Sequence, residues 1–211
     1  MVSETNAKPP LDFSNKGLAV RLGRLFFQSR NFISAPLFVF MLFFFRWEYE
    51  NDAVLWPTGI ALVCLGETLR LWAMRHIGRS ARTRRDKARR LVNTGPYAYT
   101  RNPLYIGNHL ILTGFCVLSE LLWFIPAALG LCFVFYNCIV LYEEELLRQR
   151  FGEEYLSYMR QTARWIPLPF SALTPDSPWL EAFRRERSTL YGLVAGIAVF
   201  ALEEFILHLI H

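Results

Sequence analysis

Two short segments of the sequence combine residue types that can bind a charged ligand. In the first, Gly95-Pro96 predicts a turn, and Pro103 suits the first turn of a helix, where its missing N–H costs nothing. Arg101 stands just before that expected helix start. Free N–H groups at a helix N-terminus attract anions, and a guanidinium adds a planar fork that matches a carboxylate. The segment therefore predicts a site for an anion.

Aromatic residues extend what this first segment could bind. Tyr97, Tyr99 and Tyr105 offer ring faces and hydroxyl groups beside Arg101. Together these groups could hold a carboxylate, a ribose and an adenine. The alternative is an interfacial loop with a basic anchor and a belt of aromatic rings, which is common where a chain meets the membrane surface.

The second segment is the run Glu143, Glu144 and Glu145, which follows a long apolar stretch. The C-terminal end of a helix disfavours negative charge, and so does an anionic inner leaflet. Three adjacent carboxylates therefore need a cationic partner. The basic loop 79–90 is one candidate, and a bound cation is another.

Other ionisable residues lie inside apolar runs. Glu67 and Arg70 are one helical turn apart in the run 53–74, and such residues usually face the interior of a helix bundle and pair there. They either orient a substrate or only hold helices together. Glu203, Glu204 and His208 pose the same question near the end of the chain, where we favour a role in structure or assembly.

Long apolar runs are the elements that must position these residues. The 211-residue chain is 53% hydrophobic, with a mean hydropathy of +0.22. A membrane-spanning helix needs about 20 mostly apolar residues. We predict an all-α integral membrane fold with five transmembrane helices, the third and fourth of which form a helical hairpin. The expected spans are residues 31–47, 53–75, 103–119, 121–142 and 188–211.

The distribution of basic residues predicts the orientation of these spans. Lys and Arg gather in residues 1–30, 75–101 and 148–187, whereas the connection at residues 48–52 has none. Cytoplasmic loops carry the excess of positive charge. We therefore expect a multi-pass protein whose N-terminus and catalytic loops are cytoplasmic and whose C-terminus lies outside.

The same patterns divide the chain into three parts. Residues 1–30 form a cytoplasmic N-terminal segment, in which 17–30 could be an interfacial helix or a basic flank. Residues 31–187 form the membrane core, and 188–211 the fifth span. Within the core, the helix of the fourth span continues to Gly152, a second short helix covers 153–160, and 171–187 is expected to be a polar loop.

Composition also argues against some kinds of site. Four cysteines, Cys64, Cys116, Cys132 and Cys138, fall inside expected spans without a CxxC pair, so we interpret them as small buried hydrophobic residues. The four histidines show no metal-binding spacing. The basic cluster 79–90 lacks interleaved aromatic residues, so we expect no nucleic-acid partner.

The two segments together resemble a known family. The pattern GPYxxxRxPxY is followed, after a helical hairpin, by EExxLxxxFGxxY and then by a basic residue and a proline. This order resembles the isoprenylcysteine carboxyl methyltransferases and the wider group of membrane methyltransferases that includes phospholipid methyltransferases. The resemblance runs from about Leu91 to Pro167, with weaker similarity in the helix from Gly66 to Gly78.

The resemblance implies a membrane methyltransferase core that uses S-adenosylmethionine and acts on a lipid-like or prenylated acceptor entering from the bilayer. Glu143 and Glu144 would close the cofactor pocket, and Tyr155 and Arg164 would belong to its lid. Seven further residues would enclose the cofactor: Gly95, Pro96, Tyr97, Arg101, Asn102, Pro103 and Tyr105.

Two features depart from the family pattern. Asn102 stands where the family usually has His, and an amide cannot titrate near neutral pH. The eukaryotic prenylcysteine enzymes carry arginines just before the glutamates, where this chain reads Tyr136-Asn137-Cys138-Ile139-Val140. An arginine would steady a substrate carboxylate, so Arg70 would have to fill that role.

The methyl sulfonium of the cofactor needs no activation, so the protein must align the reactants and exclude water. A carboxylate acceptor needs a cation to orient it, whereas an amine or thiol needs a base such as Glu143 or Glu144. Two other classes remain open. One is an NADPH-dependent membrane reductase of the sterol reductase type, with Arg84-Arg85 near the extra phosphate, and the other is a non-catalytic membrane scaffold.

Overall fold

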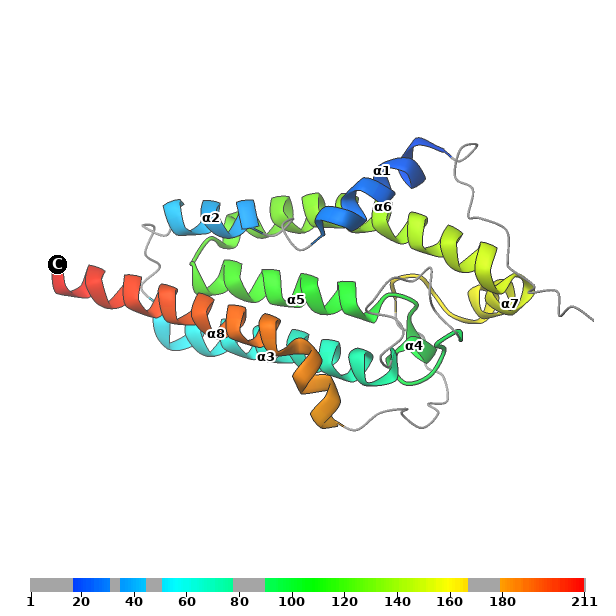
Figure 1. Ribbon diagram of the computed structural model, residues 1–211. Helices are drawn as coiled ribbons and strands as arrows, with labels where there is room; N and C mark the ends of the chain where they lie inside the picture. Colours follow the sequence, from blue (N-terminus) through cyan, green and yellow to red (C-terminus); the bar gives the residue numbers. More distant parts are fainter. Residues whose placement is uncertain (1–16, 31–34, 45–50, 78–89, 167–178, 211) are drawn as a thin grey trace, which may run out of the picture.

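The computed structural model describes residues 17–30, 35–44, 51–77, 90–166 and 179–210 (Figure 1). Within these ranges the chain is helical, apart from turns and one isolated bridge between Thr100 and Ala163. The elements are α1 (Leu18–Ser29), α2 (Ala35–Phe44), α3 (Asp52–Ile77), α4 (Pro96–Tyr99), α5 (Pro103–Leu118), the 3-10 helix η2 (Leu122–Phe124), α6 (Ile125–Phe151), α7 (Glu153–Gln161) and α8 (Trp179–Ile210). The predicted all-α membrane fold is confirmed.

Three of the helical segments are long and apolar enough to cross a membrane. They are Asp52–Ile77, Leu122–Phe151 and Ala182–Ile206. The shorter apolar helices, Ala35–Phe44 and Pro103–Leu118, coincide with the first and third expected spans. At a rise of about 1.5 Å per residue, a 16-residue helix such as α5 is shorter than the hydrocarbon core. Five crossings therefore stay a prediction, with three of them supported by helix length.

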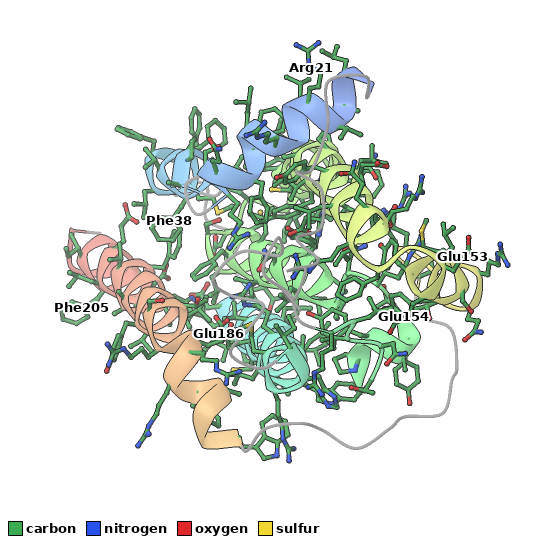
Figure 2. All side chains as sticks on the ribbon, turned by 45° about the vertical axis from the view of Figure 1, so that its right-hand side comes forward. Arg21, Phe38, Glu153, Glu154, Glu186 and Phe205 are labelled. Atoms are coloured by element: carbon green, nitrogen blue, oxygen red, sulfur yellow. The ribbon has the colours of Figure 1, made fainter. Side chains whose placement is uncertain are left out.

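α5 occupies the centre of the bundle, with α6 on one side and α3 and α8 on the other (Figures 1 and 2). α3 and α5 approach closely because glycines face each other across the contact. A Cβ built on Gly66 would lie 2.7 Å from the carbonyl oxygen of Gly107, and one built on Gly107 would lie 2.8 Å from that of Gly66. Small residues allow helix backbones in membranes to pack in this way.

The core surrounds α5 and α6. Phe115 and Cys116 of α5 are buried against Cys132 and Ile139 of α6, and Phe200 of α8 completes the same cluster. Two of the cysteines are buried as predicted, but Cys64 is exposed and Cys138 is partly exposed. Cys64 lies on the outer face of α3. Inside a membrane the outer face of a helix is apolar as well, so an apolar run in the sequence does not distinguish the outer face from the buried face.

The hairpin and the extension of α6 beyond its apolar run follow the sequence expectation. α5 ends at Leu118, and Glu120 takes a positive φ of 57° in the short connection to α6. α6 runs on to Phe151 and ends at Gly152, whose φ of 55° costs glycine little. α7 then begins at Glu153, as predicted.

Residues 17–30, for which an interfacial helix and a basic flank were both open, contain the short helix α1. It packs on α6, where Phe26 contacts the ring of Phe135 at 4.7 Å between centroids. A Cβ added to Gly23 would overlap the carbonyl oxygen of Cys138. Gly23 and the apolar Phe26 of this helix therefore form a packed helix–helix contact with α6.

The polar loop predicted for residues 171–187 is partly wrong. α8 begins at Trp179, so residues 179–187 are helical, and residues 167–178 lie outside the described part of the chain. Ala182, Glu186, Leu193, Gly196 and Phe200 are buried at helical spacing. The charged residues between them form the exposed side of an amphipathic helix rather than a loop.

Candidate active site

The Gly95 turn docks directly on the end of α3. Gly95 has a positive φ of 59°, and a Cβ at this position would overlap the imidazole ring of His76. The backbone N–H of Ala98 donates to the carbonyl oxygen of Gly95 at 3.0 Å and closes the single turn of α4. Nδ1 of His76 also lies 3.0 Å from the hydroxyl of Thr94. The turn therefore fixes where Tyr97 and the following residues lie.

The two sequence segments meet through the chain that follows α7. The N–H of Arg101 donates to the carbonyl oxygen of Ala163 at 2.9 Å. The carbonyl oxygen of Arg164 accepts from the Thr100 hydroxyl at 3.1 Å and from the Asn102 side-chain amide at 3.0 Å. Asn102 thus serves as a structural donor, which needs no titratable group.

Glu144 is the centre of the charge network. Arg164 donates two hydrogen bonds to its carboxylate, from Nε at 3.0 Å and from Nη2 at 2.7 Å. Nη2 of Arg101 lies 3.3 Å from the same carboxylate, which is buried. The cationic partners of Glu144 are therefore Arg164 and Arg101. Neither belongs to the basic loop 79–90, of which residues 79–89 lie outside the described chain.

The three adjacent glutamates have separate partners. Glu145 accepts from the side chain of Gln149 at 2.9 Å and pairs with Arg148 at 3.7 Å. The hydroxyl of Tyr105 donates to Glu143 at 3.2 Å. Because neighbouring residues on a helix point in different directions, Glu143 and Glu144 serve two different parts of the site.

Two hydrogen-bond donors of Arg101 are not used by the described residues. The Arg101 side chain is only 9% exposed. Its Nε and Nη1 are buried and have no hydrogen-bond partner among the described residues. A buried polar group without a partner costs free energy, so this guanidinium is ready to receive an anionic ligand. Each of these two donors can give a carboxylate one charge-assisted hydrogen bond.

Arg70 is surrounded by partners from three helices. It donates to Glu67 at 3.1 Å on its own helix, to Glu186 of α8 at 2.7 Å, and to the side chain of Asn108 on α5. The hydroxyl of Thr189 lies 3.4 Å from the same nitrogen that contacts Glu186. The predicted Glu67–Arg70 pair is confirmed, and Glu186 is a partner that the sequence reading missed.

Two cavities adjoin this network. A small one of about 60 Å³ lies between the Gly95 segment, α6 and α7, and a large one of about 690 Å³ lies between α2, α3, α5, α6 and α8. Ile77 lines both. Glu144 faces the small cavity and Glu143 the large one, so the two neighbouring glutamates mark the boundary between them.

The predicted site residues separate into three groups. Five line the small cavity: Tyr97, Arg101, Asn102, Glu144 and Tyr155. Three line the large cavity: Arg70, Tyr105 and Glu143. The other four, Gly95, Pro96, Pro103 and Arg164, line neither cavity and instead shape the backbone or hold Glu144.

The structure adds residues that the sequence reading did not single out for the site. Tyr158 lines the small cavity and donates its hydroxyl to the carbonyl oxygen of Tyr97 at 2.7 Å. Asn108 and Tyr136 line the large cavity and are joined by a hydrogen bond of 3.3 Å. The helical spacing of Ala182, Glu186 and Leu193 is the one sequence signal that could have revealed the contribution of α8.

Known proteins with similar sequences indicate which family this site resembles. The sequence model of the phospholipid methyltransferase family matches residues 55–154. The protein-S-isoprenylcysteine O-methyltransferase of Schizosaccharomyces pombe is 30% identical over 125 residues, which cover 53% of this chain and 49% of that protein. These matches confirm the resemblance to the isoprenylcysteine and phospholipid methyltransferase-like family. The family match includes both the Gly95 segment and the three glutamates.

Other relatives carry names of a different kind. The nickel-cobalt-cadmium resistance protein NccN of Alcaligenes xylosoxydans xylosoxydans is 33% identical over 117 residues, 55% of this chain and 51% of that protein. The cobalt-zinc-cadmium resistance protein CzcN of Cupriavidus metallidurans is 32% identical over 123 residues, 57% of this chain and 51% of that protein. Among the described residues, no group of three or more His, Cys, Asp or Glu side chains could hold a metal ion.

The comparisons also have clear limits of coverage. The chain spans about half the length of the curated relatives it matches. The family match ends at residue 154, before Arg164 and α8. No solved structure matches the chain significantly. The family match therefore does not include the partners that come from α8 and from Arg164.

Proposed function

We propose that this protein is an S-adenosylmethionine-dependent methyltransferase that acts on a lipophilic or membrane-resident acceptor at the cytoplasmic face. The observation that carries the proposal is the position of Arg101, which lines one cavity beside Glu144 and has two buried donors without a partner among the described residues, while Glu143 lines a second and larger cavity. A transferase needs two adjacent binding sites, one for the donor and one for the acceptor.

The residues of the small cavity fit the donor chemically. Its carboxylate can accept a single hydrogen bond from Nε or from Nη1 of Arg101, and its ammonium matches Glu144. Tyr97, Tyr155 and Tyr158 bring aromatic rings to the same cavity. When bound, the donor supplies a methyl group that is already electrophilic, so the protein has to orient the two reactants and exclude water.

The size of the cavities constrains this arrangement. Small-molecule pockets usually enclose about 300–1,000 Å³. The large cavity, at about 690 Å³, lies in that range, but the small one, at about 60 Å³, does not. The small cavity alone cannot enclose the whole donor, and Ile77, which lines both cavities, marks where the donor would extend toward the acceptor.

The large cavity suits an amphipathic acceptor. Phe38, Met41 and Phe115 give it apolar walls, whereas Tyr105 and Asn108 give it polar groups. Figure 2 shows Phe38 between α2 and α8, where its ring packs against Phe115 and Phe200. An apolar chain would lie along these walls, and its reactive head would lie near Tyr105 and Glu143. The names of the isoprenylcysteine O-methyltransferases support such an acceptor.

Calorimetry on the purified protein in detergent tests the donor. We expect S-adenosylmethionine and S-adenosylhomocysteine to bind and NADPH not to bind. Binding of NADPH alone would favour a reductase, and binding of none of the three by folded protein would favour a scaffold. A labelled-methyl assay on extracted lipids, prenylcysteine and small thiols then tests transfer.

A further inference from the structure

The first turns of α8 carry an amphipathic outer face. Trp179 and Phe183 are 43% and 46% exposed, and Arg184 and Arg187 are exposed as well. Phe183 is one helical turn from both Trp179 and Arg187, so aromatic rings and a guanidinium share this face. Figure 1 shows these turns bent away from the line of the rest of α8. The face therefore lies on the outside of the helix bundle.

The inner side of the same turns is fixed to α3. Ala182 is buried, and Glu186, whose side chain is 4% exposed, lies 2.7 Å from Arg70. The guanidinium of Arg75 lies over the ring of Trp179, 4.5 Å from its centroid. These contacts determine which side of α8 faces outward, so the exposure of the aromatic rings and arginines follows from the packing of the helix.

α1 has a similar outer face. Leu18 and Leu25 are 71% and 60% exposed, and Arg21 and Arg24 are exposed too. Gly23 is buried against α6, and the sequence of α1 contains no acidic residue. Figure 2 shows Arg21 on the outer side of the helix. α1 therefore also combines apolar side chains with guanidiniums on its exposed side.

The two outer faces lie at the same level along the bundle. α1 packs on α6 at Cys138, two positions from Tyr136. The hydroxyl of Tyr136 accepts from Asn108 of α5, which accepts from Arg70 of α3, which in turn donates to Glu186 of α8. Figures 1 and 2 show α1 and the first turns of α8 on opposite sides of the bundle. A single membrane surface could therefore contact both faces.

The charge of these faces is positive throughout. Arg21, Arg24, Arg184 and Arg187 are exposed, and none of them pairs with another residue in the described part of the chain. Glu186 is the one acid among the described side chains of α1 and of residues 182–191, and it is buried against Arg70. Exposed leucines and aromatic rings are poorly matched to water, and guanidiniums are poorly matched to hydrocarbon. The interface of an anionic bilayer suits both kinds of group.

We propose that the outer faces of α1 and of the first turns of α8 form a docking surface for anionic phospholipids. The leucines and aromatic rings enter the boundary between headgroups and acyl chains, and the arginines bind the negatively charged headgroups. This end of the bundle is the one predicted to be cytoplasmic, and cytoplasmic leaflets carry anionic lipids. The proposal does not depend on the proposed function, because it concerns a surface outside both cavities.

Association of spin-labelled lipids with the full-length protein tests the proposal. The protein would be reconstituted in phosphatidylcholine bilayers. Electron paramagnetic resonance would then measure the association of labelled phosphatidylglycerol relative to labelled phosphatidylcholine. One arginine near an anionic surface favours binding by about fivefold. Averaged over all lipids around the protein, the preference for phosphatidylglycerol should be at least about twofold.

Matched substitutions locate this preference on the molecule. Arg184→Gln together with Arg187→Gln should lower the preference by at least about a third, and the corresponding double substitution in α1 should act in the same direction. Arg184→Lys with Arg187→Lys keeps the charge and should keep most of the preference. Arg148→Gln with Arg160→Gln removes the same charge from exposed positions on α6 and α7, and this control should leave the preference unchanged.

Each outcome supports or overturns the docking surface. Equal association of the two lipids with the wild-type protein would overturn it, and so would an equal loss of preference in the control and in the α8 variant. If the α8 variant does not fold, the α1 variant and the salt dependence of the wild-type protein decide. Salt at 1 M shortens the Debye length to about 3 Å and should abolish the preference. A preference that survives this salt, or that the α1 variant retains in full, would contradict the proposal.

Discussion

At the residue scale, Glu144 has two arginine partners with different roles in the candidate site. Glu144 binds Arg164 through two hydrogen bonds and Arg101 through one contact of 3.3 Å. The stronger pairing with Arg164 holds the chain after α7 in place. The weaker pairing with Arg101 leaves two of its donor atoms, Nε and Nη1, without partners in the described part of the chain. Arg101 is therefore a better candidate than Arg164 for direct contact with a ligand.

Substitution of Arg101 and of Glu144 should therefore weaken cofactor binding. Arg101→Ala removes the donors for a carboxylate, and Glu144→Ala removes the counter-charge for an ammonium, so we expect each to lose at least about tenfold in affinity for S-adenosylhomocysteine. Calorimetry gives the dissociation constants. Arg148→Ala is the control, because this exposed arginine contacts Glu145 at 3.7 Å and does not line the small cavity. Unchanged affinity in both test variants would mean that the pocket is misplaced.

Gly95 supports a second prediction at this scale, concerning stability. Alanine at this position would have to adopt a φ of 59° and would overlap the ring of His76. We expect Gly95→Ala to lower stability by about 1–3 kcal/mol or more, since positive φ alone has a cost of this order. Thermal unfolding in detergent measures the change. Gly130→Ala is the control, because a Cβ at Gly130 of α6 meets no other atom within 4 Å, and it should be neutral or slightly stabilising.

The pairing of Glu186 with Arg70 links α8 to α3 at the scale of whole elements. Removal of one partner from a buried ion pair leaves an uncompensated charge and typically costs about 3–5 kcal/mol. Glu186→Ala should therefore lower the unfolding temperature more than Glu153→Ala on the exposed side of α7. The double variant Glu186→Ala with Arg70→Met should lose less than the sum of its single variants. Additive losses in this cycle would show that the pair does not couple the two helices.

The sequence predicted most helices correctly, for identifiable reasons. The length of α6 and its end at Gly152 followed from an apolar run, a helical pattern and a single glycine. The short hairpin followed from the few residues between two apolar runs. The start of α8 was missed because residues 179–187 are mostly charged, and the burial of Glu186 depends on Arg70, which lies more than a hundred positions away. A tertiary partner of this kind has no local signal.

At the scale of the whole molecule, the candidate site depends on segments that are far apart in the sequence. The Gly95 segment, the glutamates of α6 and Arg164 were predicted as parts of one site, and their side chains do meet. The sequence could not show that Glu143 and Glu144 would face different cavities, or that Arg70 would already be occupied. Both facts depend on helix rotation and on packing between helices, which an apolar pattern leaves open.

The predicted orientation of the molecule in the membrane can be tested with single introduced cysteines. Basic residues are concentrated around residues 75–101 and 148–187, and the connection before α3 contains none, so α7 should be cytoplasmic and the start of α3 external. We expect a membrane-impermeant thiol reagent to label Asn51→Cys in intact cells, and to label Glu153→Cys only after permeabilisation. Both positions are exposed, so burial does not decide the result. The unsubstituted protein, with its four native cysteines, gives the background. Labelling of Glu153→Cys in intact cells would reverse the orientation and place the candidate site on the opposite side of the membrane.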